Sequence, residues 1–282
     1  MKNKILILGN GYIGNRLCEE LGAELAGGRI SSLLDAQEQI QMYKPNIIIN
    51  CIGHTGRNVD DCELDKDKTL MANTFVPVIL GEAALRDNIK LIHISSGCIY
   101  KFDYSQDSPI KEDKTPDFFR LFYSRTKIYA EQALKALFKE CPALIVRIRI
   151  PLDNRPHPKN LLTKLLEYKK IIDIPNSVTY IPDFIEALKH LIHINAEGIY
   201  NVVNRDGLRY PDLLDAYKKY IPDFQYRVVD YKELNLVRTN LILSTAKLQR
   251  SGFKVRDINS VLDECVRGYL GYSGTVPTKA IS

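Results

Sequence analysis

The chain has 282 residues, of which 45% are hydrophobic and 26% are charged, and its formal net charge is +5. This length allows one large domain or a domain with a smaller companion, and no biased or repeated segment indicates a disordered chain or a solenoid. Lysines and arginines are scattered and no stretch could span a bilayer, so we expect neither a nucleic-acid nor a membrane partner.

Cysteine and histidine spacing predicts neither disulfides nor a metal site. The six cysteines contain no CxxC pair, which indicates reduced thiols and a cytoplasmic protein. His190 and His193 lack a nearby third ligand of the usual kind, so no metal is expected.

The first predicted unit is a strand, a glycine turn and a helix. An apolar run at 4–8 leads into a GxGxxG turn and a helical pattern at 13–21. In this order, backbone amides and the helix N-terminus meet a pyrophosphate, and glycines stand where side chains would block the approach. We therefore expect a dinucleotide to bind at Gly9, Asn10, Gly11, Tyr12, Ile13 and Gly14.

The second strand is weakly marked, at 24–26, and no acidic residue follows it to hold a ribose 2′-hydroxyl. Arg29 stands there instead. An arginine can form two hydrogen bonds to a 2′-phosphate, so the sequence favours NADP(H) over NAD(H). The alternative is a solvated surface arginine.

Apolar strands and amphipathic helices then alternate along the chain. Helices are predicted at 35–43, 66–87 and 122–139, and strands at 47–51, 90–95 and 144–150. The alternation predicts an α/β fold, a Rossmann-type doubly wound parallel sheet. Chemistry in such sheets gathers beyond the carboxyl ends of the strands, where Gly9, Gly53 and Ser96 fall. We expect Cys51 and Gly53 to contact the cofactor as well.

The pattern changes after about residue 150. Three prolines interrupt it, and short helices are predicted at 160–170, 182–193, 210–220 and 259–270, with brief strands such as 198–203. We therefore expect residues 1–150 to form a dinucleotide-binding domain and residues 151–282 to form mainly a smaller substrate-binding cap. The polar loop at 102–116 is predicted to form a rim or lid.

Tyr123 and Lys127 lie four residues apart on the predicted helix 122–139 and so share one face. A tyrosine has a reference pKa of about 10, and a neighbouring cation favours the phenolate, so the pair can pass a proton near neutral pH. Ser96 can offer a second hydroxyl to the same reacting oxygen. The spacing alone is a common accident on helices, but the upstream serine and the glycine turn favour catalysis.

The glycine turn, Ser96, Tyr123 and Lys127 together resemble the extended short-chain dehydrogenase/reductases, and among them the dTDP-4-dehydrorhamnose reductase branch. Further segments are similar to the bifunctional UDP-4-keto-6-deoxyglucose 3,5-epimerase/4-reductases, which make UDP-L-rhamnose: residues 53–60, 97–100, 122–127, 158–164 and 174–179. The glycine turn departs from the family's usual GxxGxxG spacing by one residue. The resemblance implies NADPH as cofactor, a nucleotide-sugar substrate with UDP preferred over dTDP, and a homodimer.

The resemblance also implies roles for individual residues. Tyr123 would give a proton to the C4 oxygen, Lys127 would hold the nicotinamide ribose, and Ser96 would orient the carbonyl. Cys98 and Lys164 match the pair assigned to epimerisation. Contacts with the nucleotide sugar are implied for Arg57, Asn160, Asn176 and Arg238.

The epimerisation roles are chemically reasonable. A C4 ketone acidifies the hydrogens at C3 and C5, and inversion needs a base on one face and an acid on the other. A thiol, with a reference pKa of about 8.5, suits the acid, whereas Lys164 would need a lowered pKa to act as base. Three hypotheses stay open: the two-function enzyme, a reductase that relies on a separate epimerase, and a cofactor-binding regulatory subunit.

Overall fold

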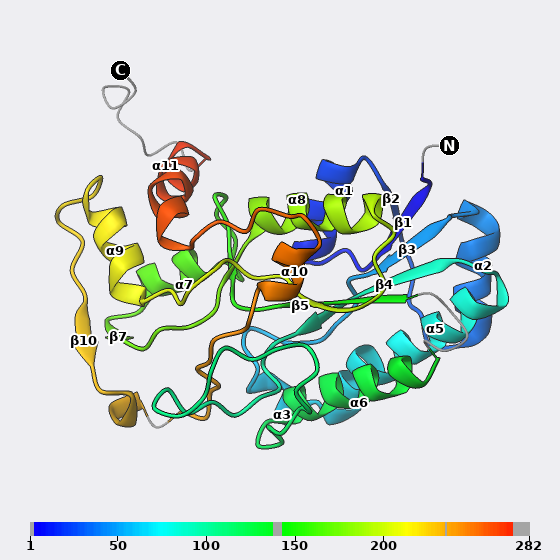
Figure 1. The fold of residues 1–282 in the computed structure, drawn as a ribbon, viewed down its shortest axis with the longest axis horizontal. Helices are drawn as coiled ribbons and strands as arrows, with labels where there is room; N and C mark the ends of the chain where they lie inside the picture. Colours follow the sequence, from blue (N-terminus) through cyan, green and yellow to red (C-terminus); the bar gives the residue numbers. More distant parts are fainter. Residues whose placement is uncertain (1–2, 138–142, 235, 273–282) are drawn as a thin grey trace. The chain divides into compact units, whose positions relative to one another are not determined.

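The computed structural model describes residues 3–137, 143–234 and 236–272, which form two compact units (Figure 1). The first unit comprises residues 3–100, 115–137, 143–147 and 189–200. The second comprises residues 101–114, 148–188, 201–234 and 236–272. A single division at residue 150 therefore does not describe the chain, because residues 101–114 belong to the second unit and residues 189–200 belong to the first.

A six-stranded sheet forms the centre of the first unit, in the order β2-β1-β3-β4-β5-β9. Its strand β1 pairs in parallel with both β2 and β3, and β3 pairs in parallel with β4. These strands are apolar runs because the sheet is covered on both faces. Their bounds are Ile5–Leu8 (β1), Glu24–Ala26 (β2), Ile47–Asn50 (β3), Lys90–Ser96 (β4), Ala143–Ile148 (β5) and Gly198–Asn201 (β9).

Helices cover this sheet, with α1 on one face and α5 and α6 on the other (Figure 1). Leu80 of α5, Leu134 of α6 and Ile145 of β5 belong to one buried apolar cluster. The helices of this part of the chain are Tyr12–Leu21 (α1), Leu33–Tyr43 (α2), Asp61–Leu64 (α3), Lys66–Leu70 (α4), Val76–Arg86 (α5) and Phe122–Leu137 (α6).

Several predicted elements of the first unit end at other residues in the structure; the strand predicted at 198–203, for example, ends at Asn201. The helix predicted at 66–87 is divided into α4 and α5 by a π-helix, η1, at Met71–Phe75. The strand predicted at 144–150 ends at Ile148, and Ile150 has a φ of +37°. The end of the helix predicted at 122–139 lies outside the described residues, as does Cys141.

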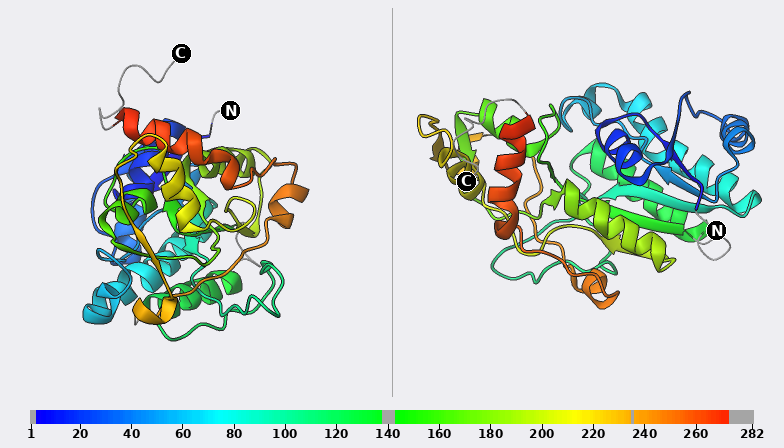
Figure 2. Two further views of the ribbon diagram at one scale, coloured as in Figure 1. Left: turned by 90° about the vertical axis from the view of Figure 1, so that its left-hand side faces the viewer. Right: turned by 90° about the horizontal axis from the view of Figure 1, so that it is seen from above.

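The second unit contains two small parallel sheets, β6 with β8 and β10 with β7. Helices α9 and α11 pack against each other in this unit (Figure 2). The strands are Pro151–Leu152 (β6), Lys170–Ile172 (β7), Thr179–Tyr180 (β8) and Arg227–Val229 (β10). The helices are Leu161–Glu167 (α7), Ile181–His193 (α8), Tyr210–Lys218 (α9), Ala246–Arg250 (α10) and Leu262–Tyr272 (α11), with 3₁₀ turns at Tyr231–Leu234 (η2) and Asn259–Val261 (η3).

The loop predicted at 102–116 belongs largely to the second unit. Ile110 forms a parallel bridge with Leu243, and the Ile110 amide donates to the Ile242 carbonyl at 2.8 Å. The Asn201 side-chain amide donates to the Ile110 carbonyl at 3.0 Å. These contacts hold the segment around Ile110 against residues 242–243 and against Asn201.

Candidate active site

The glycine turn after β1 is tightly packed where Gly9 and Gly14 lie. Gly9 has a φ of +109°, and a Cβ atom there would come within 2.7 Å of the Cys51 backbone. A Cβ atom on Gly14 would meet the Gly9 carbonyl oxygen at 1.8 Å. By contrast, a Cβ atom on Gly11 would meet nothing within 4 Å, so the turn leaves open space there.

The open space adjoins the N-terminus of helix α1. Gly11 is its N-cap, no side chain caps it, and no acidic residue stands in its first turn. The first amides of a helix lack partners within the helix and favour an anion. This arrangement fits the pyrophosphate of a dinucleotide, as the sequence predicts. Arg29 is exposed after β2, and its contact with a 2′-phosphate stays a prediction.

Ser96 ends strand β4 and begins a hydrogen-bonded link to helix α6. Its hydroxyl oxygen accepts a hydrogen bond from the Cys98 amide at 3.1 Å. The Cys98 carbonyl in turn accepts one from the Ser124 hydroxyl at 2.5 Å. Ser96 and Ser124 are buried, so this link fixes the end of β4 against the first turn of α6.

Tyr123 and Lys127 both lie on α6, as predicted, and both are buried, with exposed fractions of 8% and 4%. The Lys127 Nζ atom lies 3.6 Å from the position of a Cβ atom on Gly53, so the ammonium reaches the end of β3. Burial lowers the pKa of Lys127 to about 8, against the attraction of Glu131.

Cys51 lies beside the glycine turn at the end of β3. Burial raises the pKa of its thiol to about 12, with Lys127 acting in the opposite direction, so Cys51 stays protonated at neutral pH. Arg57, further along, is exposed, and its backbone amide donates to the Asp61 carboxylate at 2.7 Å. Its predicted contact with the sugar nucleotide stays a prediction.

The sequence reasoning missed Asn73, which is buried in the π-helix η1. Its side-chain oxygen accepts from the His54 amide at 2.8 Å. Its side-chain nitrogen donates to the His54 carbonyl at 3.0 Å and to the Thr126 hydroxyl at 3.2 Å. Asn73 thus joins the segment after β3 to the turn of α6 between Tyr123 and Lys127. Its one signal in the sequence is an asparagine, a poor helix former, inside a predicted helix.

Lys164 lies half-buried on α7 in the second unit. Its pKa is lowered, first by burial and then by the charges of Lys159 and Arg238, whereas Glu167 opposes the change. A lowered pKa is the condition that a lysine must meet to act as a base near neutral pH. Arg238 is also half-buried, and its guanidinium donates to the Val237 carbonyl at 2.8 Å.

Asn160 is fully buried and supports the backbone around it. It caps α7 by accepting from the Leu162 amide at 3.2 Å, and its side-chain nitrogen donates to the carbonyls of Asp153 and Arg155, both at 2.8 Å. Because these bonds engage both ends of the amide, the structure gives Asn160 a supporting role, and direct contact with substrate stays a prediction.

Asn176 is likewise buried and engaged. It accepts from the Arg149 guanidinium at 2.9 Å and from the Leu241 amide at 3.2 Å, and it donates to the Asn240 side chain at 2.9 Å. These bonds join its loop to the segment that follows Arg238. Its predicted contact with substrate also stays a prediction.

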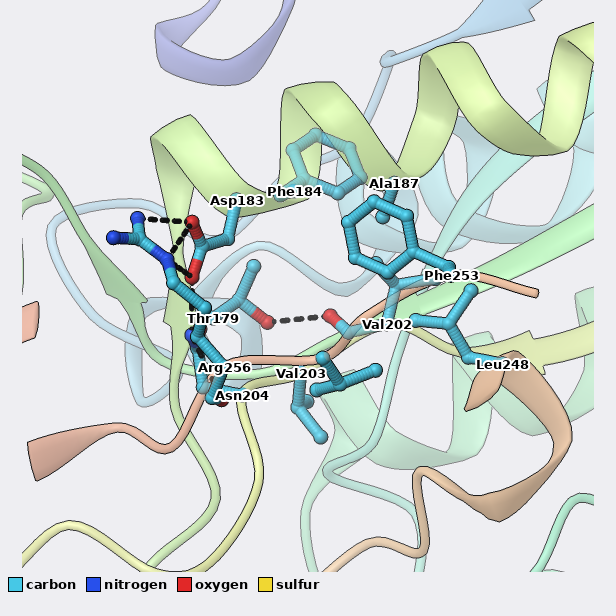
Figure 3. Close-up of a pocket in the computed structure, with 11 residues that line it drawn as sticks. Thr179, Asp183, Phe184, Ala187, Val202, Val203, Asn204, Leu248, Phe253 and Arg256 are labelled. Carbon is cyan, nitrogen blue, oxygen red and sulfur yellow. Dashed lines mark hydrogen bonds and ion pairs between the residues drawn. The ribbon is translucent and has the colours of Figure 1, made fainter. Parts of the chain in front are cut away.

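A cavity in the second unit is too small to hold a nucleotide sugar. Its volume is about 10 Å³, room for about one water molecule. Figure 3 shows Asp183 receiving hydrogen bonds from Arg256 at one end of the cavity, and the apolar side chains of Phe253 and Leu248 at the other end. We find no candidate active site there.

Within residues 3–137, 143–234 and 236–272, no three or more His, Cys, Asp and Glu side chains gather so as to hold a metal ion. Likewise, none of the helices in the described part of the chain is long and apolar enough to cross a membrane.

The model of the RmlD substrate binding domain family matches residues 3–175. This chain belongs to that family. A bifunctional dTDP-4-dehydrorhamnose 3,5-epimerase/dTDP-4-dehydrorhamnose reductase of Arabidopsis thaliana is 32% identical over 257 residues, which cover 85% of this chain and 84% of the relative. The reductase-family resemblance of the sequence is thereby confirmed.

Other relatives of this RmlD-family chain are longer. A trifunctional UDP-glucose 4,6-dehydratase/UDP-4-keto-6-deoxy-D-glucose 3,5-epimerase/UDP-4-keto-L-rhamnose-reductase of Arabidopsis thaliana is 31% identical over 264 residues, or 88% of this chain. The match covers 39% of that relative. The chain therefore spans about two fifths of the length of this relative.

Solved structures confirm the α/β fold. The L780 UDP-rhamnose synthase of Acanthamoeba polyphaga mimivirus has a TM-score of 0.87 at 24% identity and covers 95% of this chain and 100% of its own. The dTDP-4-dehydrorhamnose reductase of Bacillus anthracis, solved in complex with NADP, has a TM-score of 0.80 at 23% identity, with 94% and 98% covered.

Proposed function

We propose that this RmlD-family chain epimerises UDP-4-keto-6-deoxy-D-glucose at C3 and C5 and reduces C4 with NADPH to give UDP-L-rhamnose. The observation that carries the proposal is the convergence, within the first unit, of Ser96 with the start of α6, and of Lys127 with the end of β3. The bifunctional Arabidopsis relative, similar over most of both chains, supports the pairing of the two activities.

The glycine turn and the N-terminus of α1 are the residues that would hold the dinucleotide. NADPH, when bound, supplies the hydride that reduces C4. Arg29 is positioned after β2 where a 2′-phosphate contact is expected, which favours NADP(H) over NAD(H). The Bacillus anthracis reductase with NADP and a Pseudomonas aeruginosa protein named RMD with NADPH support this preference.

In the reduction, Tyr123 donates its proton to the C4 oxygen and is left as a phenolate. Lys127 stabilises that phenolate, because its ammonium is the dominant form below a pKa of about 8. The Ser96 hydroxyl donates a hydrogen bond to the same oxygen and orients the carbonyl. The hydrogen bonds from Ser96 through Cys98 to Ser124 hold Ser96 against the first turn of α6.

In the epimerisation, Lys164 removes a proton next to the C4 ketone and Cys98 returns one to the opposite face. The lowered pKa of Lys164 supports its assignment as the base. Ser96 and Tyr123 stabilise the enolate oxygen by hydrogen bonds, as donors of an oxyanion hole do.

A plain 4-keto reductase is the second candidate. The similarity of the fold to that of the Bacillus anthracis protein favours it, because that protein is named as a reductase only. Cys98 and Lys164 would then have no catalytic role. A cofactor-binding regulatory subunit is disfavoured because such a module does not need Ser96, Tyr123 and Lys127 together.

We also propose that the protein acts as a cytoplasmic homodimer. Exposed apolar side chains on α6 and on two elements that pack on it, α3 and η1, support a partner: Leu64 is 86% exposed, Phe75 48% and Tyr129 41%. Analytical ultracentrifugation of the protein and of Tyr129→Glu tests this. A dimer that Tyr129→Glu dissociates supports the proposal, and a monomeric wild type contradicts it.

The function is tested with purified protein, UDP-4-keto-6-deoxyglucose and NADPH in heavy water. The proposal predicts NADPH oxidation and UDP-L-rhamnose carrying deuterium at C3 and C5. Reduction without deuterium would support the plain reductase, and the absence of any NADPH oxidation would contradict both. The same assay with the dTDP sugar measures the nucleotide preference.

A further inference from the structure

A buried ion pair lies between helix α6 and strand β5 in the first unit. The Arg147 guanidinium contacts the Glu131 carboxylate through Nε, at 3.0 and 3.1 Å, and through a terminal nitrogen at 2.6 Å. The two side chains are 0% and 1% exposed. Buried ion pairs contribute little net stability compared with apolar residues of the same shape, so this pair calls for another explanation.

The pair contacts both ends of the segment that carries Ser96 and Cys98. On one side, the Ser95 hydroxyl donates to Glu131 at 2.6 Å. On the other, the Arg147 guanidinium lies over the Tyr100 ring, 5.4 Å from its centroid. Residues 95 and 100 flank the segment that carries Ser96 and Cys98, so the buried Glu131–Arg147 pair contacts that segment at both of its ends.

The same pair acts on Lys127. Glu131 follows Lys127 by four residues, so the two side chains share one face of α6. Arg147 and Ser95 hold the Glu131 carboxylate by hydrogen bonds. The carboxylate therefore raises the pKa of Lys127 by its charge and forms no ion pair with the ammonium. No ion pair to Lys127 is found among the residues that the structure describes.

Other titratable groups also face Lys127 from the elements around α6: Cys51 after β3, Cys62 on α3 and His93 on β4. Burial raises the pKa of both thiols, to about 12 for Cys51. Burial, aided by Lys127, lowers the pKa of His93 well below its usual value. Neither the two thiols nor the imidazole therefore carries a charge at neutral pH.

We propose that Glu131 is a positioning residue of the active site: held by Arg147 and Ser95, it fixes α6 on strands β4 and β5 and provides the counter-charge for the buried Lys127 ammonium. The inference deepens the proposed function and rests on it for the role of Lys127 in turnover. Its direct test, however, is the titration of Lys127, which needs no substrate.

The titration is measured through the pH dependence of unfolding in urea, each protein being compared with its own Lys127→Met version. The difference between the two proteins isolates Lys127, because its folded pKa of about 8 lies below the ordinary lysine value of 10.5. We expect Glu131→Gln to move the folded pKa of Lys127 down by about one unit. We also expect the alkaline limb of the kcat profile to move in the same direction.

Arg147→Met separates the electrostatic role from a merely structural one. It breaks the same pair but leaves the carboxylate facing Lys127, so the folded pKa of Lys127 should stay the same or rise. The exposed carboxylate Glu38 on α2 provides the control, and Glu38→Gln should change neither quantity. Glu131→Asp, which keeps the charge, should restore part of the wild-type pKa.

If Glu131→Gln does not fold, the double variant Glu131→Gln with Arg147→Met replaces it, since it leaves no unpaired buried charge. An unchanged pKa of Lys127 in the folded Glu131→Gln or double variant would overturn the inference. So would an equal fall of that pKa in Glu131→Gln and Arg147→Met. A wild type without reductase activity would overturn the proposed function. The titration would still test whether Glu131 provides the counter-charge for Lys127, because it needs no substrate.

Discussion

The Nζ atom of Lys127 lies 3.6 Å from the point that a Cβ atom on Gly53 would occupy, and the Asn73 side-chain oxygen lies 3.3 Å from it. Gly53→Ala should therefore displace the amide of Asn73 and crowd the ammonium. We expect kcat/KM to fall by about tenfold, equivalent to roughly 1.4 kcal/mol of transition-state stabilisation. Gly271→Ala is the control, because a Cβ atom there meets nothing within 4 Å. Equal kcat/KM for Gly53→Ala and wild type would show that this contact is not needed.

Lys127→Met should inactivate the enzyme and yet stabilise the fold. Burial lowers the Lys127 pKa from 10.5 to about 8, so at pH 7 the folded state carries a charge that the unfolded state accommodates more easily. Removing it should raise the unfolding free energy at pH 7 by about 2–4 kcal/mol.

The pH dependence of that gain has a defined sign. Between about pH 8 and 10.5 the unfolded chain binds more protons at Lys127 than the folded chain, so wild-type stability rises with pH in this window. The advantage of Lys127→Met should therefore shrink from pH 8 to pH 10.5, as measured by urea unfolding. A constant difference across that window would contradict the lowered pKa.

Cys98→Ala should abolish the deuterium that arrives with inversion at C3 and C5, because the acid on the opposite face is lost, while sparing hydride transfer to a ketone that has already been epimerised. Lys164→Met should lose the same exchange, because it removes the proposed base. Mass spectrometry of the sugar measures exchange, and NADPH absorbance measures reduction. Cys18→Ala controls for loss of a thiol, since its sulfur donates to the Ala23 carbonyl away from this segment. Loss of both activities in Cys98→Ala would refute the separation of roles.

Asn160→Ala should lower stability more than it lowers substrate affinity. It removes the cap of α7 and leaves the backbone groups of Asp153 and Leu162 without their side-chain partner. We expect a loss of about 2–4 kcal/mol in unfolding free energy. Exposed Gln249→Ala in the same unit should cost far less. A stable Asn160→Ala with a greatly raised KM would instead favour direct contact with substrate.

The sequence predicts the features that depend on local spacing. Gly9 and Gly14 are recognisable because the turn tolerates no side chain at either position, and Tyr123 and Lys127 because the helical repeat puts them on one face. The alternation of strands and helices likewise predicts the doubly wound sheet. Each of these features is defined by residues that are near one another in the chain.

Features that depend on distant partners could not be predicted. Asn73 and Thr126 become neighbours only when η1 packs on α6, and Glu131 meets Arg147 only when α6 packs on β5. The segment 101–114 joins the second unit because Ile110 pairs with Leu243, far along the chain. A polar residue such as Asn160 looks like a ligand in the sequence, whereas in the fold its amide satisfies buried backbone groups.

The proposed reduction of the keto sugar depends most on Tyr123 as its proton donor. The direct test is the rate of NADPH oxidation with UDP-4-keto-6-deoxyglucose for wild type and Tyr123→Phe, together with NADPH binding to both. We predict that Tyr123→Phe lowers kcat by about 10²–10⁴-fold and leaves NADPH affinity nearly unchanged, because only the phenolic proton is lost. Turnover by Tyr123→Phe at the wild-type rate would contradict the account.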